Sequence, residues 1–202
     1  KYTHPDLEGN VWINPDEIAG NGIDDDNDGY IDNIYGWDVG DNDNNPIHPN
    51  ANFSHGTHVG GCASAQADNG IGIASIGFNV SLMGVKCTEN SQSNVNAIPF
   101  GYEGISYSAR AGAHIINCSW SGSFGGQTGQ QVINFARSRN SIVVAAASND
   151  DVNSLRYPAA FTGVIAVAST AINVAKSSFS NFGTWVDISA PGTTIYSTIP
   201  NT

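Results

Sequence analysis

The chain has 202 residues, enough for one sizeable hydrophobic core and short for two domains. Its 18 Asp and Glu residues against 7 Lys and Arg give a net charge of -11, which repels phosphate backbones and argues against nucleic acid as a partner. No apolar run approaches the length of a membrane span. We therefore expect one domain that binds neither nucleic acid nor a membrane, and a composition rich in Asp and Asn that favours bound cations.

The three cysteines, Cys62, Cys87 and Cys118, have long and unequal spacings, and an odd number cannot close a complete set of disulfides. Each lies in a segment that we predict to be core. We interpret them as buried thiols, with a reactive nucleophile as the alternative.

The chain opens with Lys-Tyr-Thr-His-Pro-Asp-Leu, in which Asp6 follows Pro5 and could simply cap a turn. A polar insertion rich in Asp and Asn then runs from about residue 8 to residue 52. Trp12, Tyr35 and Trp37 argue against plain disorder in it, because large aromatic side chains can anchor a loop to the body of a protein.

Residues 24–32 of this insertion carry five carboxylates in nine residues and repeat the first ligand positions of an EF-hand calcium loop. Those positions are Asp24, Asp26, Asp28, the carbonyl of Tyr30, and Asp32. Tyr35 stands where the loop's final Glu is expected, so water or residues elsewhere would have to complete the set. Carboxylates this close repel one another without a cation. A solvated acidic loop is the alternative.

Residues 54–61, Ser-His-Gly-Thr-His-Val-Gly-Gly, are the most informative stretch. Ser54 is a good helix N-cap, and helical spacings continue as far as Gln66. The many small residues predict a helix packed closely on every side, with His55 at its exposed N-terminal end. The positive end of the helix dipole disfavours a protonated imidazole, which suits a general base. His55 and His58 could instead bind a metal, but no nearby Cys or His completes a set.

Residues 67–77 contain three glycines, which permit turns that aim several backbone carbonyls inward. Calcium accepts such carbonyl oxygens, so this loop is a second candidate cation site. A tight turn into the next strand is the alternative.

The rest of the chain alternates apolar runs of strand length with helical patterns. Strands buried on both faces are predicted over 80–87, 114–120, 141–147 and 163–169. Helices are predicted over 96–110 and 130–139, the first with Asn96 as N-cap, Pro99 at its third position and Gly112 at its end. This rhythm predicts an α/β fold, doubly wound, with a mostly parallel sheet, right-handed crossovers and helices on both faces.

Ligands of such sheets bind beyond the carboxyl ends of the strands. Asn-Cys-Ser-Trp-Ser-Gly at 117–122 and Ala-Ala-Ala-Ser-Asn-Asp at 145–150 follow two of the predicted strands. They are therefore the candidate binding segments. A core role for Trp120 and a capping role for Asn149 are the simpler alternatives.

These motifs, in this order, resemble those of the subtilisin-like serine proteases, the subtilases. His-Gly-Thr-His-Val at 55–59 is similar to the motif of the family's catalytic histidine, and Ala-Ala-Ser-Asn at 146–149 resembles Ala-Ala-Gly-Asn, whose Asn donates to the oxyanion. Further landmarks lie at 156–160, 178–183 and 187–192. The resemblance implies a serine endopeptidase that hydrolyses peptide bonds with a Ser-His-Asp triad.

The resemblance implies that His55 is the general base and Asn149 the oxyanion donor. It also implies two groups of substrate-binding residues, one that pairs with the substrate backbone and lines the pocket for the side chain before the scissile bond, and one that forms the pocket's other wall. The first group is Ser119, Trp120, Ser121 and Gly122, and the second is Ala146, Ala147 and Ser148. Ser148 stands where the family usually has Gly, so its hydroxymethyl group would narrow the pocket.

Structural calcium at one or two sites is implied as well. The first site would use the Asp6 carboxylate, the Asn69 side chain and the carbonyls of Ala67, Ile71 and Ile73. The second would be the acidic pattern at 24–32, which looks like an insertion of some bacterial subtilases.

In the family, the catalytic Asp precedes a His-Pro-Asp-Leu segment, which is present here at residues 4–7, and the catalytic serine lies in Gly-Thr-Ser. Neither this catalytic Asp nor the Gly-Thr-Ser serine is found in residues 1–202. We expect these residues to be a single incomplete subtilase catalytic domain that is inactive by itself. The parent protein would be a secreted or cell-surface monomer that acts on polypeptides. The alternatives are an inactive homologue that serves as a calcium-stabilised peptide-binding module, and an adhesion module, which the single occurrence of the acidic loop disfavours.

Overall fold

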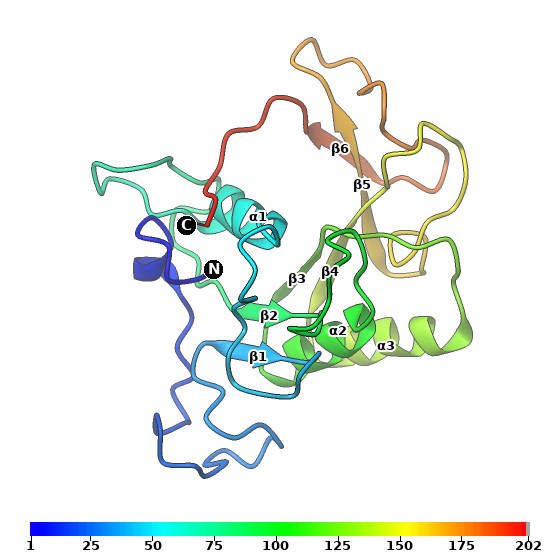
Figure 1. Cartoon of the computed structure of the whole chain (residues 1–202). Helices are drawn as coiled ribbons and strands as arrows, with labels where there is room; N and C mark the ends of the chain where they lie inside the picture. Colours follow the sequence, from blue (N-terminus) through cyan, green and yellow to red (C-terminus); the bar gives the residue numbers. More distant parts are fainter. Residues whose placement is uncertain (201–202) are drawn as a thin grey trace. The chain divides into compact units, whose positions relative to one another are not determined.

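The structure is a computed structural model that describes residues 1–200. The chain folds into two compact units. The first unit is Lys1–Gly104 together with the segment from Tyr196 onward, and the second unit is Ile105–Ile195. Each unit has its own parallel sheet (Figure 1), and these sheets with their helices confirm the predicted α/β class.

The sheet of the first unit pairs β1 (Gly36–Asp38) with β2 (Gly84–Lys86), and Trp37 is in register with Val85. A short 3-10 helix, η1, covers Glu8–Asn10. Strand β1 lies inside the segment that we predicted as a polar insertion, so the insertion is not loop throughout. All three residues of β1 are buried.

Asp38 can be buried in β1 because the ammonium group of Lys86 in β2 forms an ion pair with it. Lys86 also donates to Asp41 at 2.8 Å, and the backbone N–H groups of Gly40 and Asp41 donate to Asp38. A buried charge is tolerated when it is paired and hydrogen-bonded in this way.

Helix α1 (His55–Ser64) begins where the sequence predicts. Two details of that prediction are wrong. The Ser54 side chain makes no capping hydrogen bond, although the Ser54 carbonyl accepts the His58 N–H at 3.1 Å. His55 is exposed as predicted, but the helix is not enclosed on every side beyond it, since Gly56 and Ala63 are exposed as well.

The small residues of α1 are needed on one side of the helix. The Ser197 and Thr198 hydroxyls donate to the carbonyls of His58 and Thr57 at 2.6 and 2.7 Å. A Cβ on Gly61 would collide with both of these side chains. Close approach of the 197–198 segment therefore requires glycine at this position.

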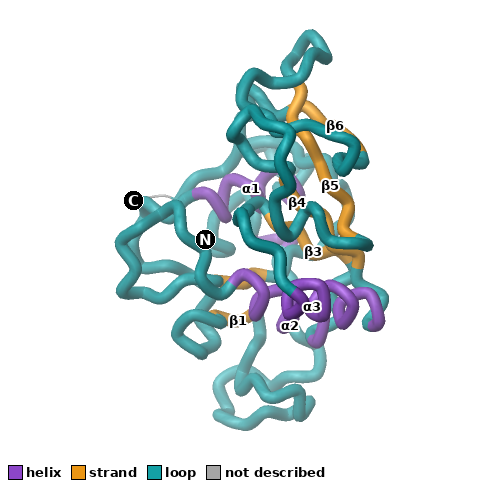
Figure 2. Tube along the Cα trace, turned by 90° about the vertical axis from the view of Figure 1, so that its right-hand side faces the viewer, coloured by secondary structure: helices purple, strands orange, loops and turns teal. Residues whose placement is uncertain are grey.

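The sheet of the second unit has four parallel strands in the order β3-β4-β5-β6. The strands are β3 (Ile115–Cys118), β4 (Ile142–Ala146), β5 (Val164–Thr170) and β6 (Ile188–Pro191). Helix α2 (Gly101–Arg110) precedes β3, and α3 (Gln127–Ser138) connects β3 to β4. Helix α3 packs against β4 (Figure 2), whereas the connections to β5 and β6 contain no helix.

Three features of this part of the chain differ from what the sequence predicted. Helix α2 begins at Gly101, so Asn96 and Pro99 lie before it, in agreement with the tendency of proline to keep the preceding residue out of the helical region. Strand β6 was not predicted. Strands β3 and β4 are buried on one face only, because Ile115 and Ile142 are 66% and 50% exposed.

Gly112 ends α2 as predicted. Its φ of +80° is a left-handed conformation that glycine adopts without a steric penalty. The Ala113 N–H then donates back to the Ser108 carbonyl at 2.9 Å, which is the hydrogen bond expected at such a helix end.

We predict that Gly36→Ala destabilises the chain by about 2 kcal/mol or more. Gly36 has φ +127°, and a Cβ there would collide with the Gly84 carbonyl oxygen, so β1 and β2 would have to separate. Gly56→Ala is the control, because that position is helical and open, and it should stabilise by about 0.5–1 kcal/mol. Urea unfolding measures both, and equal midpoints for the two variants would contradict the prediction.

Candidate active site

The two candidate binding segments of the second unit lie side by side. Strands β3 and β4 are parallel neighbours, with Cys118 in register with Ala145, so the residues that follow them leave the sheet at the same edge. The Ser121 hydroxyl donates to the Ser148 hydroxyl oxygen at 3.0 Å. The residues that the sequence placed in one substrate site therefore meet, at least in this pair.

Asn181 holds the turn that follows β4. Its side chain is fully buried, and its Oδ1 accepts the N–H groups of Asp150 and Val152 at 2.8 and 3.4 Å. The Asn181 N–H donates to the Ser148 carbonyl at 3.0 Å. This turn presents Asn149 at the surface, and within residues 1–200 the Asn149 amide has no hydrogen-bond partner.

The segment after β3 is anchored at Gly122. Its N–H donates to the Tyr157 carbonyl at 2.8 Å, and its carbonyl accepts the Tyr157 N–H at 2.9 Å. Gly122 was predicted to pair with substrate, but both of its backbone groups are already used. The stretch available for pairing therefore shortens to Ser119, Trp120 and Ser121.

The Ser148 hydroxyl continues the polar contact from Ser121. It donates to the Asp150 carboxylate at 2.8 Å, and Arg156 forms an ion pair with the same carboxylate oxygen at 3.0 Å. The hydrogen bond from Ser148 and the one from Arg156 lower the pKa of Asp150, so this carboxylate is ionised at neutral pH. Ser148 has φ +85°, a conformation that favours glycine.

His55 is the first residue of α1 in the first unit, as predicted. The residue is exposed, but neighbouring atoms bury part of its ring, and this burial is the main cause that lowers the pKa of His55. The charge of His58 adds to the effect. The direction of the shift agrees with the expectation of a neutral imidazole, although the predicted cause was the helix dipole.

Three residues of the first predicted calcium site, Asp6, Asn69 and Ile73, lie together in the first unit. Asp6 is buried, and its carboxylate accepts the Asn69 amide at 2.9 Å and the Ile73 N–H at 2.8 Å. Gln66 and residues 68–74 line an adjacent cavity of about 310 Å³. A buried carboxylate is a ligand that calcium accepts, and in this structure it accepts hydrogen bonds from the Asn69 amide and the Ile73 N–H.

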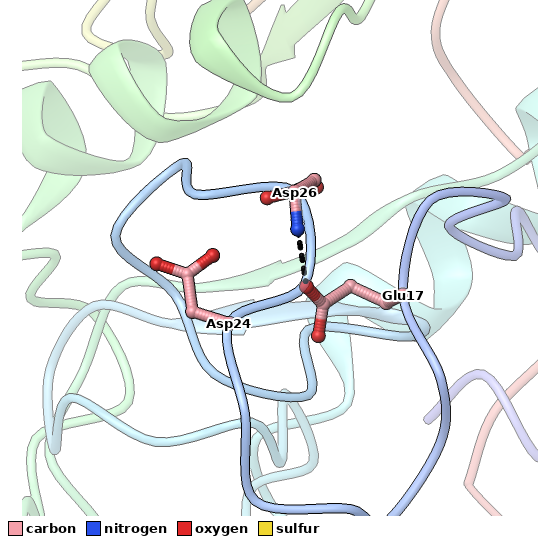
Figure 3. A group of neighbouring side chains, drawn as sticks. All are labelled: Glu17, Asp24 and Asp26. Carbon is pink, nitrogen blue, oxygen red and sulfur yellow. Dashed lines mark hydrogen bonds between the residues drawn. The ribbon is translucent and has the colours of Figure 1, made fainter.

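The acidic loop brings only part of its predicted set together. Carboxylate oxygens of Asp24, Asp26 and Glu17 lie within 4.8 Å of one another (Figure 3). Asp32 instead accepts N–H groups of residues 20–22 at 2.7–3.2 Å, and Asp28 accepts the Tyr30 N–H at 2.9 Å.

Glu17 was missed by the sequence analysis. It is buried, and its Oε1 accepts the N–H groups of Asp25 and Asp26, the second drawn as a dashed line in Figure 3. No sequence pattern singles out Glu17, because it precedes the acidic loop and only the folded chain brings it beside Asp24 and Asp26. Three clustered carboxylates fit calcium, which prefers hard oxygen ligands. Burial and the charge of Asp26 raise the pKa of Asp28 nearby, in line with mutual repulsion in this loop.

The cysteines form no disulfide in the described part of the chain. Cys118 is buried, and burial raises the pKa of the Cys87 thiol to about 12, so these two agree with inert thiols. As residues, however, Cys62 and Cys87 are both only half-buried, so full burial as predicted holds for Cys118. Among residues 1–200 no helix has the length and apolar character needed to cross a membrane.

An α/β fold that carries these segments beyond its strand ends, together with the His-Gly-Thr-His helix, defines a protein of the subtilisin-like class. The sequence model of the subtilase family matches residues 1–202, and the chain belongs to this family.

Two curated relatives and one solved structure give the scale of the similarity. Thermitase from Thermoactinomyces vulgaris is 43% identical over 168 residues, which cover 83% of this chain and 58% of thermitase. A thermophilic serine proteinase from Bacillus sp. (strain AK1) is 36% identical over 199 residues, 98% of this chain and 43% of that protein. The structure of a protease from Pseudoalteromonas arctica matches with a TM-score of 0.61 and 34% identity, over 68% of this chain and 43% of that one. This chain thus spans about half the length of the relatives that it matches.

We predict that the His55 imidazole titrates below pH 6.5 in an NMR titration. Because the folded state then binds fewer protons than the unfolded state, the stability should rise with pH between the lowered pKa and 6.5. His58→Gln should raise the pKa of His55 but leave it below 6.5, since burial is the larger cause.

His55→Gln assigns the resonance in this titration. A midpoint at or above 6.5, or a midpoint that does not respond to His58→Gln, would contradict the prediction.

Proposed function

We propose that this chain is part of a serine endopeptidase of the subtilisin type, in which His55 is the general base and Asn149 donates a hydrogen bond to the oxyanion. The observation that carries the proposal is the turn after β4. A fully buried Asn181 fixes that turn, and the Asn149 amide at its surface has no partner within residues 1–200. The fixed turn positions the backbone of Asn149, and its unpartnered amide is available to donate to a developing negative charge.

The chemistry would proceed by attack of a serine hydroxyl on the peptide carbonyl. His55, whose lowered pKa favours the neutral imidazole, takes the hydroxyl proton and later gives it to the leaving amine. Asn149 stabilises the negative oxygen of the tetrahedral intermediate. Gly-Thr-Ser does not occur in residues 1–202, so we assign the nucleophile to no residue of this chain and expect residues 1–202 alone to be inactive.

The substrates would be polypeptides. We propose that their backbone adds as a strand beside Ser119–Ser121, because Gly122 is already paired with Tyr157. The side chain before the scissile bond would enter between this segment and residues 146–148. The family resemblance also leads us to propose a protein that acts as a monomer, secreted or at the cell surface.

Calcium would support the first unit at two places. Asp6, with Asn69 and the carbonyls of the following loop, would hold one ion, and Glu17, Asp24 and Asp26 the other. Bound calcium would neutralise carboxylates that otherwise repel one another.

We predict that Asn149→Ala in the full-length protein lowers kcat by about 10²–10³ with little change in KM, because the lost interaction is made mainly in the transition state. His55→Ala should lower kcat at least as much. Asn134→Ala is the matched control, since Asn134 is exposed on α3, and its activity should equal that of the wild type. Peptide hydrolysis by purified proteins measures all three.

Equal activity of Asn149→Ala and Asn134→Ala would overturn the assignment of the oxyanion donor. A full-length protein that binds peptides but never cleaves them would favour the alternative, an inactive peptide-binding module.

We predict that calcium raises the melting temperature of the 202-residue chain, since an ion that binds only the folded state stabilises it. Glu17→Gln should remove part of this increase and leave the part due to Asp6. Asp16→Asn is the control, because Asp16 is exposed and lies outside the carboxylate cluster. A melting temperature that a calcium chelator does not change would count against both sites.

A further inference from the structure

Two serine hydroxyls bridge the two walls of the proposed side-chain pocket. Ser121 lies on the segment after β3 and Ser148 on the segment after β4, and their oxygens are 3.0 Å apart. Ser121 is exposed and Ser148 half-buried, so the bridge lies at the accessible edge of the second unit.

The bridge leaves no room for a side chain between the two oxygens. Carbon atoms make their best contacts at about 3.5 Å, so a methylene or ring between these oxygens would need them about 7 Å apart. The Ser121–Ser148 bridge therefore stops a substrate side chain that enters between the two segments, unless the serines rotate away.

Hydrogen bonds on the Ser148 side hold the bridge in place. The Ser148 proton is used by the Asp150 carboxylate at 2.8 Å, so Ser148 accepts the proton of Ser121. Arg156 holds Asp150 at 3.0 Å. Hydrogen bonds to an ionised acceptor are stronger than neutral ones, so Ser148 is fixed and rotation falls mainly on Ser121.

The backbone at Ser148 supports the same conclusion. Its φ of +85° favours glycine, yet a serine stands there. The turn keeps this conformation because Asn181 binds both the Ser148 carbonyl and the Asp150 N–H. The strained residue contributes the hydroxymethyl group that closes the gap.

We propose that the Ser121–Ser148 bridge closes the pocket for the residue before the scissile bond, so that the protease cleaves after residues with small side chains, glycine and alanine, and discriminates against aromatic ones. This inference rests on the proposed function and adds the substrate class. One rotating serine limits the discrimination, which we expect to be on the order of 100-fold in kcat/KM for alanine over phenylalanine.

The test uses the full-length protein and two peptide p-nitroanilides that differ only in the residue before the scissile bond, alanine or phenylalanine. Ser148→Gly removes one side of the bridge and suits the left-handed backbone, so the variant should fold. It should raise the ratio of kcat/KM for phenylalanine over alanine about tenfold or more. Ser121→Gly should act in the same direction, and Ser123→Gly, an exposed serine two residues further on, should leave the ratio unchanged.

The outcomes separate the two proposals. A protein that cleaves both substrates equally, with a ratio that Ser148→Gly does not change, would overturn the pocket inference and leave the protease assignment intact. A protein with no activity on either substrate would overturn both. An independent test is to digest a denatured protein with the full-length protease and to identify the cleavage sites by mass spectrometry. Cleavage mainly after phenylalanine or tyrosine would contradict the inference.

Discussion

The parallel pairing of β3 with β4 is the constraint on which the proposed substrate site depends. Adjacent parallel strands end at the same edge of a sheet, so the residues after Cys118 and after Ala146 leave it together. Gly122 is then fixed by Tyr157, and Ser148 by Asn181. The site is thus built from loops, but each loop is tied to the sheet within a few residues.

The sequence predicted the parts of this arrangement that depend on local pattern. Continuous apolar runs identified β3, β4 and β5 to within a few residues, and the polar residues after them gave the candidate binding segments. Helix α1 began at His55 as expected because small and polar residues there follow helical spacing. Whether the site residues act as proposed stays a prediction.

The features that escaped prediction depend on contacts between distant residues. Strand β1 is short and ends in an aspartate, and it is buried only because Lys86 comes from 48 residues further along the chain to pair with Asp38. Glu17 joins the acidic cluster only through the fold of its loop. Asn181, which holds the turn after β4, lies 31 residues beyond Asp150. The hydrophobic periodicity of a single sequence cannot predict which distant residues come into contact.

The most direct test of this account is a crystal structure of the full-length protein with a peptide boronic acid that ends in alanine, which mimics the tetrahedral intermediate. We predict that the peptide pairs with Ser119–Ser121 and that a boronate oxygen lies about 2.7–3.1 Å from the Asn149 side-chain nitrogen. A peptide bound away from this segment, or an Asn149 side chain turned away from the boronate, would contradict the account.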